Sequence, residues 1–227
     1  MAVSIAIVGG GLMGHGIAQV FAVAGFPVRL TDPAPEVRQK VPGRIKSNLE
    51  EIGGDVAALD RVEVVDDLAA CVGPADFVIE AAPEDLELKQ SLFADIERLA
   101  PAEAILASNT SVIPIAKVMG RVRRKERALG AHWWNPPYLV PLVEVVRAQE
   151  TSHAAVAATM ALLRQAGKRP VEVKRDVAGF VGNRLQHALW REAIALVAEG
   201  VCDAKTVDDV VKLSFGARPG AWAHRER

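Results

Sequence analysis

The chain has 227 residues, 50% hydrophobic and 24% charged, a composition typical of globular proteins that excludes wholesale disorder. Its 27 Lys and Arg residues nearly balance 28 Asp and Glu residues, so the net charge of −1 gives no overall attraction for nucleic acid or an anionic membrane. No apolar run reaches the roughly 18 residues that span a bilayer, and Cys71 and Cys202 have no metal-ligand spacing, so we predict a cytoplasmic protein with no membrane segment and no metal site.

Short apolar runs alternate with longer amphipathic segments from the N-terminus onward. The runs are rich in β-branched residues and end at turn-forming residues, as buried strands do, whereas the longer segments have helical periodicity. In chain order, the predicted strands are 3–8, 27–31, 62–65, 76–80, 104–107, 128–133, 142–146 and 170–173, and the predicted helices between them are 12–24, 35–52, 85–99 and 151–166. Pro42 should break or kink the second helix.

This alternation predicts an α/β fold with a doubly wound, mainly parallel sheet. The pattern changes after Asp176 to two long helical segments, 180–199 and 203–213. We therefore predict a first domain of residues 1–177 and a partial all-α domain of residues 178–227. A segment of about 50 residues buries too little apolar surface to fold well alone, so it should dock on the first domain or on another chain.

The first turn carries a glycine pattern, Gly9-Gly-Gly11-Leu12-Met13-Gly14, directly after a predicted strand and before a predicted helix. In this context the pattern G-x-G-x-x-G predicts a Rossmann-type dinucleotide site, where glycines permit a tight turn and close approach of the backbone to a pyrophosphate. Asp32 ends the second strand, where a carboxylate accepts the adenosine ribose hydroxyls and disfavours a 2′-phosphate. We predict NAD as the cofactor; the alternatives are a plain structural turn and an Asp32 cap beside Pro33.

Three polar residues follow or lie within the later strands. Ser111 follows the fifth strand, His132 lies near the end of the sixth, and Glu144 lies within the seventh. If the last two strands run side by side, Glu144 can hold one imidazole nitrogen of His132, a pairing suited to removing a proton from an alcohol. Each residue also has a structural explanation: a packed histidine, a surface charge on a strand, or a helix cap at Ser111.

The order of motifs resembles the 3-hydroxyacyl-CoA dehydrogenase family over nearly the whole chain. The resemblance lies in Gly9-x-Gly11-x-x-Gly14, Glu80-Ala-Ala-Pro-Glu84, Ser108-Asn-Thr-Ser111, His132-Trp-Trp-Asn-Pro136, Leu142-Val-Glu144-Val and Gly179-Phe-Val-Gly-Asn183-Arg-Leu. Segments 135–144 and 178–186 are similar to the λ-crystallin/L-gulonate and carnitine dehydrogenase branches, whereas His132-Trp-Trp is similar to the fatty-acyl branch.

The resemblance implies a role for each matching residue. His132 would be the general base toward the 3-hydroxyl, Glu144 its partner, and Ser111 and Asn183 hydrogen-bond donors to the reacting oxygen or nearby substrate and cofactor groups. Further contacts around the nicotinamide half of NAD would come from Glu84, Lys89 and Asn135. The implied reaction is oxidation of an L-3-hydroxyacyl-CoA to the 3-oxo product by hydride transfer to NAD⁺.

Two departures from the family pattern affect the expected substrate and assembly. The segment between Asp32 and Glu80 is short and offers only Arg44 and Lys46 as candidate CoA contacts. Residues 219–227 do not fit the family, so we expect a C-terminally truncated chain. In such a chain, Trp222 and the apolar face of the last helix would not be packed against the further helices of the family. Such a face favours self-association, and we predict a homodimer if the C-terminal helices suffice.

Three functions are compatible with the sequence. The leading prediction is an NAD-dependent 3-hydroxyacyl-CoA dehydrogenase. The second is a dehydrogenase of a small hydroxy acid such as L-gulonate or carnitine, favoured by the Asn135-Pro-Pro-Tyr segment and the short CoA-side segment. The third is a truncated, non-catalytic NAD-binding or structural protein.

Overall fold

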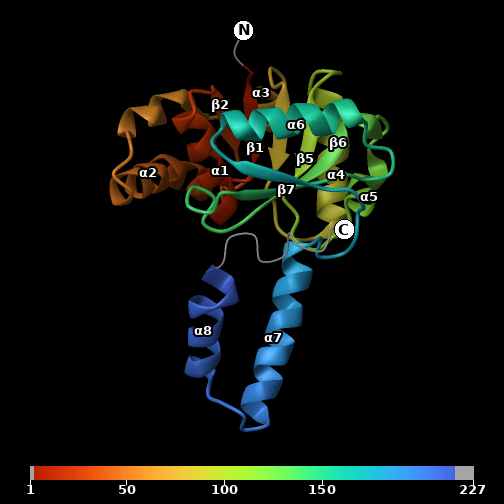
Figure 1. The fold of residues 1–227 in the computed structure, drawn as a ribbon. Helices are drawn as coiled ribbons and strands as arrows, with labels where there is room; N and C mark the ends of the chain where they lie inside the picture. Colours follow the sequence, from red (N-terminus) through yellow and green to blue (C-terminus); the bar gives the residue numbers. More distant parts are fainter. Residues whose placement is uncertain (1–2, 218–227) are drawn as a thin grey trace. The chain divides into compact units, whose positions relative to one another are not determined.

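The computed structural model describes residues 3–217, and its central feature is an eight-stranded sheet (Figure 1). The strand order is β3-β2-β1-β4-β5-β6-β7-β8. The strands are β1 (Ile5–Val8), β2 (Val28–Thr31), β3 (Val62–Val64), β4 (Phe77–Glu80), β5 (Ile105–Ser108), β6 (Ala128–Trp133), β7 (Leu142–Val146) and β8 (Arg169–Val173). The helices are α1 (Leu12–Val23), α2 (Pro35–Glu51), α3 (Leu68–Val72), α4 (Leu86–Leu99), α5 (Ile115–Val118), α6 (His153–Gln165), α7 (Gly182–Ala198) and α8 (Ala204–Leu213), with 3₁₀ turns at Val56–Arg61, Met119–Arg121, Lys125–Arg127 and Phe215–Ala217.

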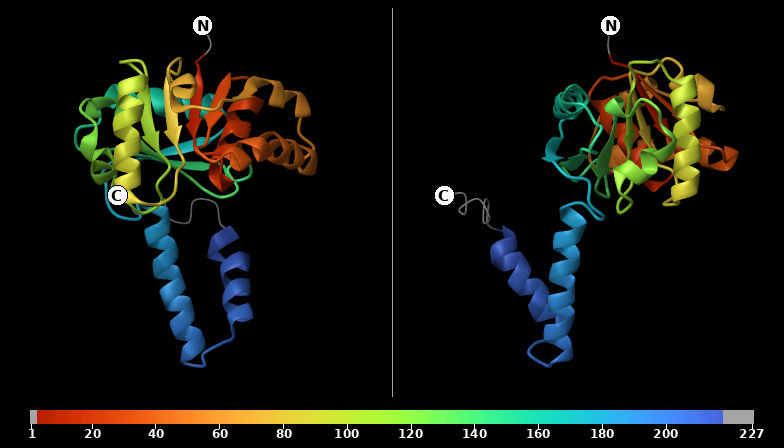
Figure 2. Two further views of the ribbon diagram at one scale, coloured as in Figure 1. Left: turned by 180° about the vertical axis from the view of Figure 1, so that it is seen from behind. Right: turned by 90° about the vertical axis from the view of Figure 1, so that its right-hand side faces the viewer.

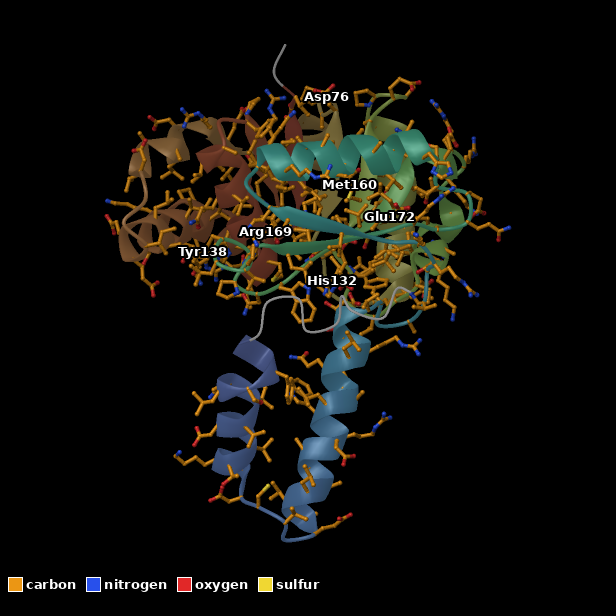
Figure 3. The ribbon with its side chains drawn as sticks, in the orientation of Figure 1. Asp76, His132, Tyr138, Met160, Arg169 and Glu172 are labelled. Carbon is orange, nitrogen blue, oxygen red and sulfur yellow. The ribbon has the colours of Figure 1, made fainter. Side chains whose placement is uncertain are left out.

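Six of the seven strand pairings are parallel, which confirms the predicted fold class. The antiparallel pairing joins β6 to β7, which are connected without a crossover helix. A strand can return directly beside its predecessor only when the two run antiparallel. The carboxyl ends of β1, β2, β4, β5 and β6 therefore lie at one edge of the sheet. His132 and Tyr138 lie toward this edge, and Asp76 lies toward the opposite one (Figure 3).

Helices cover both faces of the sheet, as a doubly wound fold requires (Figure 2). One face packs on α1, α2 and α6 through a core that contains Phe21, Ile45 and Leu163. The other packs on α3, α4 and α5 through a core that contains Phe93 and Ile115. Because both faces are buried, the central strands are continuous apolar runs rather than alternating ones.

Helix α2 continues through Pro42, so of the two predicted effects, a break or a kink, the break does not occur. Proline inside a helix costs about 3 kcal/mol because it removes one hydrogen bond and crowds the preceding turn. The same helix buries Val41, Ile45 and Leu49 completely. Fully burying each such side chain contributes about 1.5–3 kcal/mol, so tertiary packing outweighs the local cost.

The chain divides into two compact units, residues 1–180 and 181–227. The second unit contains α7 and α8, which pack on each other. Asp203 caps α8 by accepting a hydrogen bond from the Thr206 amide at 2.7 Å. Neither helix buries a residue within the single chain, and Leu185, Trp190 and Ile194 are all exposed. Residues 219–227, which include Trp222, lie outside the described part of the chain.

Within residues 3–217, the structure contains no helix long and apolar enough to cross a membrane.

Candidate active site

The glycine-rich turn after β1 is built by close contacts that only glycine permits. Gly9 has a φ of +110°, and a Cβ there would lie 2.6 Å from the carbonyl oxygen of Ala81 at the end of β4. A Cβ on Gly14 would lie 1.7 Å from the Gly9 carbonyl oxygen. The turn and the first turn of α1 therefore pack without side chains, which leaves the N-terminus of α1 open toward the sheet edge.

A groove of about 750 Å³ lies along this turn. Its walls come from the turn itself, the end of β2, the end of β4 and the start of α4. The lining residues include Gly9, Gly11, Leu12, Met13, Asp32, Pro33, Ala82, Pro83 and Leu88. A largely apolar groove with the Asp32 carboxylate at the end of β2, Asp66 nearby and a helix N-terminus has the features of an adenosine and pyrophosphate site.

Asp32 is fixed by two backbone amides. Its Oδ2 accepts from Gly10 N at 2.8 Å, and its Oδ1 accepts from Ala34 N at 3.0 Å. Each carboxylate oxygen keeps a second lone pair, so both can still accept a ribose hydroxyl. The neighbouring Arg38 donates to the carbonyl oxygens of Asp32 and Pro33 and pairs with Asp66 at 3.2 Å. These residues fit an unphosphorylated ribose, as in NAD.

His132 and Glu144 face each other across the antiparallel pair β6–β7. The Glu144 Oε2 lies 2.8 Å from Nδ1 of His132, and the two residues are 1% and 3% exposed, respectively. A carboxylate on Nδ1 fixes the tautomer and directs Nε2 to the other side of the ring. This arrangement can accept a proton at Nε2 and stabilise the resulting imidazolium.

Two aromatic rings flank the imidazole of His132. The ring centroids of Trp134 and Phe180 lie 5.3 and 5.5 Å from that of His132. Phe180 has a φ of +47°, a left-handed conformation that is strained for a bulky residue and is retained here in a fully buried position. The packing holds the imidazole in one orientation. Apart from its place in the Gly179-Phe-Val-Gly motif, nothing in the sequence pointed to Phe180.

A buried polar network links the ends of β4 and β5. Glu80 accepts from the Lys89 ammonium at 2.6 Å through Oε1 and from the Ser108 hydroxyl at 2.6 Å through Oε2. Lys89 is only 1% exposed, so its ammonium faces Glu80 and, at 3.5 Å, Glu84 instead of the groove. Burying the Glu80 charge requires this counter-charge. The cofactor contact that the resemblance implied for Lys89 stays a prediction.

Glu84 joins this network to the loop that carries Ser111. Its Oε1 accepts from the Thr110 hydroxyl and from the amides of Ser111 and Val112 at 3.0 and 3.2 Å. Burial by itself would raise the pKa of Glu84, but the Thr110 hydrogen bond, the Lys89 charge and the two amides together hold that pKa below its usual value. Periodicity offered no sign of Thr110, which is fully buried.

The connection between β6 and β7 is fixed by a buried lysine. The Lys168 ammonium donates to the carbonyl oxygens of Pro137 and, at 3.0 Å, Val140, and it lies 5.5 Å from the ring centroid of Trp133. The lysine is 8% exposed, and burial lowers its pKa from an ordinary 10.5 to about 8. This connection, residues 134–141, contains Asn135, so Lys168 shapes the segment between His132 and Glu144.

We expect the stability contribution of Lys168 to change with pH. Between about pH 8 and 10.5 the unfolded chain binds more protons at this lysine than the folded chain, so stability rises with pH in that window by at most about 1.4 kcal/mol per unit. Urea unfolding should therefore show wild-type stability rising relative to Lys168→Met from pH 8 to 10. The exposed Lys46→Met serves as the control, and a difference that stays constant with pH would contradict the assignment.

The structure thus brings some of the predicted site residues together. His132 and Glu144 are in contact, and Ser111 follows β5, the strand next to β6. Gly9, Gly11 and Asp32 share the groove, whereas Glu84 and Asn135 are exposed residues outside its lining. Asn183 belongs to the second unit, in the first turn of α7.

Comparison with known proteins identifies a single family for both units. Residues 4–177 match the description "3-hydroxyacyl-CoA dehydrogenase, NAD binding domain", and residues 179–224 match "3-hydroxyacyl-CoA dehydrogenase, C-terminal domain". The second match extends past residue 218, where we had expected the family pattern to stop. The first unit is therefore an NAD-binding domain, which confirms the predicted cofactor.

Three relatives show how close the similarity is. An L-carnitine dehydrogenase from Nocardiopsis dassonvillei is 39% identical over 97% of this chain and 67% of its own length. A 5-formyl-3-hydroxy-2-methylpyridine 4-carboxylate 5-dehydrogenase from Mesorhizobium japonicum is 38% identical over 94% of this chain and 71% of its own. The crystal structure of (S)-3-hydroxybutyryl-CoA dehydrogenase from Ralstonia eutropha has a TM-score of 0.88 and 33% identity over 98% of this chain and 81% of its own.

The chain therefore spans about two thirds of the length of the curated relatives that it matches. The matches cover both units, with the glycine turn, the His132–Glu144 strands and the first turn of α7 all inside them. On this similarity and on the geometry of the site, the chain belongs to the 3-hydroxyacyl-CoA dehydrogenase family.

Proposed function

We propose that this protein is an NAD-dependent dehydrogenase of a small hydroxy acid, of the carnitine type, rather than of a CoA ester. The dehydrogenase part of the proposal rests on one observation: the buried His132–Glu144 pair lies on the sheet that carries the dinucleotide groove. Gly9, Gly11 and Asp32 would hold NAD, with its pyrophosphate at the N-terminus of α1.

In this proposal the residues of the chain move a single proton. The substrate hydroxyl gives its proton to Nε2 of His132 while its carbon loses a hydride, and the alcohol becomes a carbonyl. NAD⁺, when bound, accepts that hydride. Glu144 stabilises the imidazolium that forms, and a hydrogen bond from Ser111 would orient the reacting oxygen. Asn183 would act on the same oxygen or on nearby groups of the cofactor.

The surroundings of the two candidate CoA contacts, Arg44 and Lys46, support a small acid as the substrate rather than a CoA ester. Arg44 donates to the Gly10 carbonyl oxygen at 3.5 Å, beside the glycine turn, and Lys46 pairs with Glu50 one helical turn away at 3.8 Å. CoA carries several phosphate charges, which a cluster of cations meets best, and this segment was predicted to offer only these two. The first curated relative, at 39% identity, is named an L-carnitine dehydrogenase, and this name also favours a small acid.

The acyl-CoA prediction remains the second candidate. The solved structure with a TM-score of 0.88 is named for a 3-hydroxybutyryl-CoA substrate, and its 33% identity is only slightly lower. The His132-Trp-Trp sequence, similar to the fatty-acyl branch, also favours this substrate. A homodimer that covers the exposed apolar residues of α7 and α8 stays a prediction.

A spectrophotometric assay of NADH formation by the purified chain tests the proposal. We expect turnover with L-carnitine or another small L-3-hydroxy acid, little turnover with L-3-hydroxybutyryl-CoA, and a preference for NAD⁺ over NADP⁺ because of Asp32. His132→Gln serves as the inactive control. Turnover confined to the CoA ester would instead support the acyl-CoA candidate. NADH binding without turnover on either class would contradict a dehydrogenase function for this chain.

A further inference from the structure

We infer that Glu84 is a positioning residue that sets the backbone conformation of Ser111, rather than primarily a contact of the cofactor. The inference rests on the proposed function, in which Ser111 meets the substrate. It begins from the three hydrogen bonds that a single oxygen, Oε1, accepts from Thr110 and from the amides of Ser111 and Val112. A carboxylate oxygen offers two lone pairs, so Oε1 has no capacity left for a ligand.

In residues 111–116, which follow Thr110, every backbone amide N–H donates to a side-chain oxygen. Glu84 accepts from the amides of residues 111 and 112, and the Thr110 hydroxyl accepts from that of Ile113 at 3.1 Å. Residue 114 is a proline without an amide proton. Asp176 accepts from the amides of Ile115 at 2.9 Å and Ala116 at 2.7 Å. The path of the segment is therefore set by side-chain acceptors, and Ser111 lies at the end that Glu84 controls.

The other side of Glu84 is anchored in the protein interior. Its Oε2 faces the Lys89 ammonium at 3.5 Å, and Lys89 is fixed by Glu80 at 2.6 Å and by the Ala82 carbonyl oxygen at 3.1 Å. Glu80 in turn holds Ser108, whose hydroxyl accepts from the Thr110 amide at 3.2 Å. The Ser111 loop is thus tied at two points, by Glu84 and by Ser108, to a buried ion pair that has little freedom to move.

This geometry predicts how Glu84 affects catalysis. Displacing a reacting group by about 1 Å costs up to about 100-fold in rate without removing any contact to the cofactor. Loss of the Glu84 carboxylate should therefore lower kcat through Ser111 and leave NADH binding nearly unchanged. Glu84→Gln keeps an oxygen acceptor at the loop and loses only the charge toward Lys89, so it should retain more activity than Glu84→Ala.

A double-mutant cycle with Ser111→Ala separates positioning from direct contact. We expect Glu84→Ala to lower kcat about 10- to 100-fold in the wild type and by less than about threefold when Ser111 is already alanine. The dissociation constant of NADH should change by less than about twofold. Glu97→Ala is the matched control, because Glu97 also accepts from two loop amides, those of Arg123 at 2.9 Å and Arg124 at 2.8 Å, in a loop outside the site.

Amide hydrogen exchange tests the inference without any activity. The amides of Ser111 and Val112 should exchange faster in Glu84→Ala and close to the wild-type rate in Glu84→Gln. Unchanged exchange in Glu84→Ala would overturn the inference, as would a tenfold weaker NADH affinity with unchanged kcat. If the wild type shows no turnover on any hydroxy acid, the proposed function fails, and the exchange rates still decide whether Glu84 fixes the loop.

Discussion

His132→Ala should lower kcat by about 10²–10⁴-fold, the range that a positioned general base contributes. The imidazole is held at 2.8 Å by Glu144 and flanked by Trp134 and Phe180, so its orientation is set before a substrate arrives. The measurement is the rate of NADH formation with the substrate that the assay above identifies. The same variant should bind NADH with an unchanged dissociation constant, because the dinucleotide groove contains no part of His132.

Stability must be measured alongside activity in this variant. Truncating His132 takes the imidazole away from a carboxylate that is 1% exposed, and breaking a buried pair costs about 3–5 kcal/mol. His132→Gln is the control, because its side-chain amide can still donate a hydrogen bond toward Glu144. A folded His132→Gln protein that keeps wild-type turnover would contradict the assignment of His132 as the base.

Gly14→Ala should abolish NADH binding and lower the free energy of unfolding by about 3 kcal/mol or more. The added Cβ would lie 1.7 Å from the Gly9 carbonyl oxygen. That oxygen belongs to the backbone, and a Cβ is bonded directly to Cα, so no side-chain rotation separates the two atoms. Relief requires that α1 move from β1, which opens the turn that forms the groove. Urea unfolding and NADH fluorescence titration measure the two effects.

Two further glycine variants separate an effect on NADH binding from an effect on folding stability. A Cβ on Gly11 meets no atom within 4 Å, so Gly11→Ala should fold normally and weaken NADH binding, because Gly11 lines the groove. Gly43 also has open space around it, in α2, so Gly43→Ala should raise stability by about 0.5–1 kcal/mol and leave binding unchanged. Normal NADH affinity in a folded Gly14→Ala protein would exclude the dinucleotide assignment of this turn.

For β6 and β7, the sequence predicted the bounds of the strands but not their pairing. Residues 128–133 and 142–146 were predicted as strands with the bounds that the structure has. The sequence left open whether they lie side by side. The antiparallel pairing settles this, because it places His132 directly opposite Glu144.

The sequence by itself determined the alternation of strands and helices, the glycine turn with Asp32, and the identity of His132 and Glu144 as a candidate pair. These features are readable because strand and helix burial impose local periodicities, and because a phosphate-binding turn requires glycine at fixed spacing. Contacts between segments distant along the chain leave no such period, and local rules mislead where packing opposes them, as at Pro42.

Only the tertiary structure decided the setting of Lys89, Glu84 and Lys168. In the sequence, each of the three has the pattern of a solvated polar residue. In the structure, Lys89 is buried against Glu80, and Glu84 accepts hydrogen bonds from the loop that follows β5. Lys168 donates to carbonyl oxygens some 30 residues earlier in the chain. A buried charge is stable only beside its partner, and that partner is known only once the strands have been placed in the sheet.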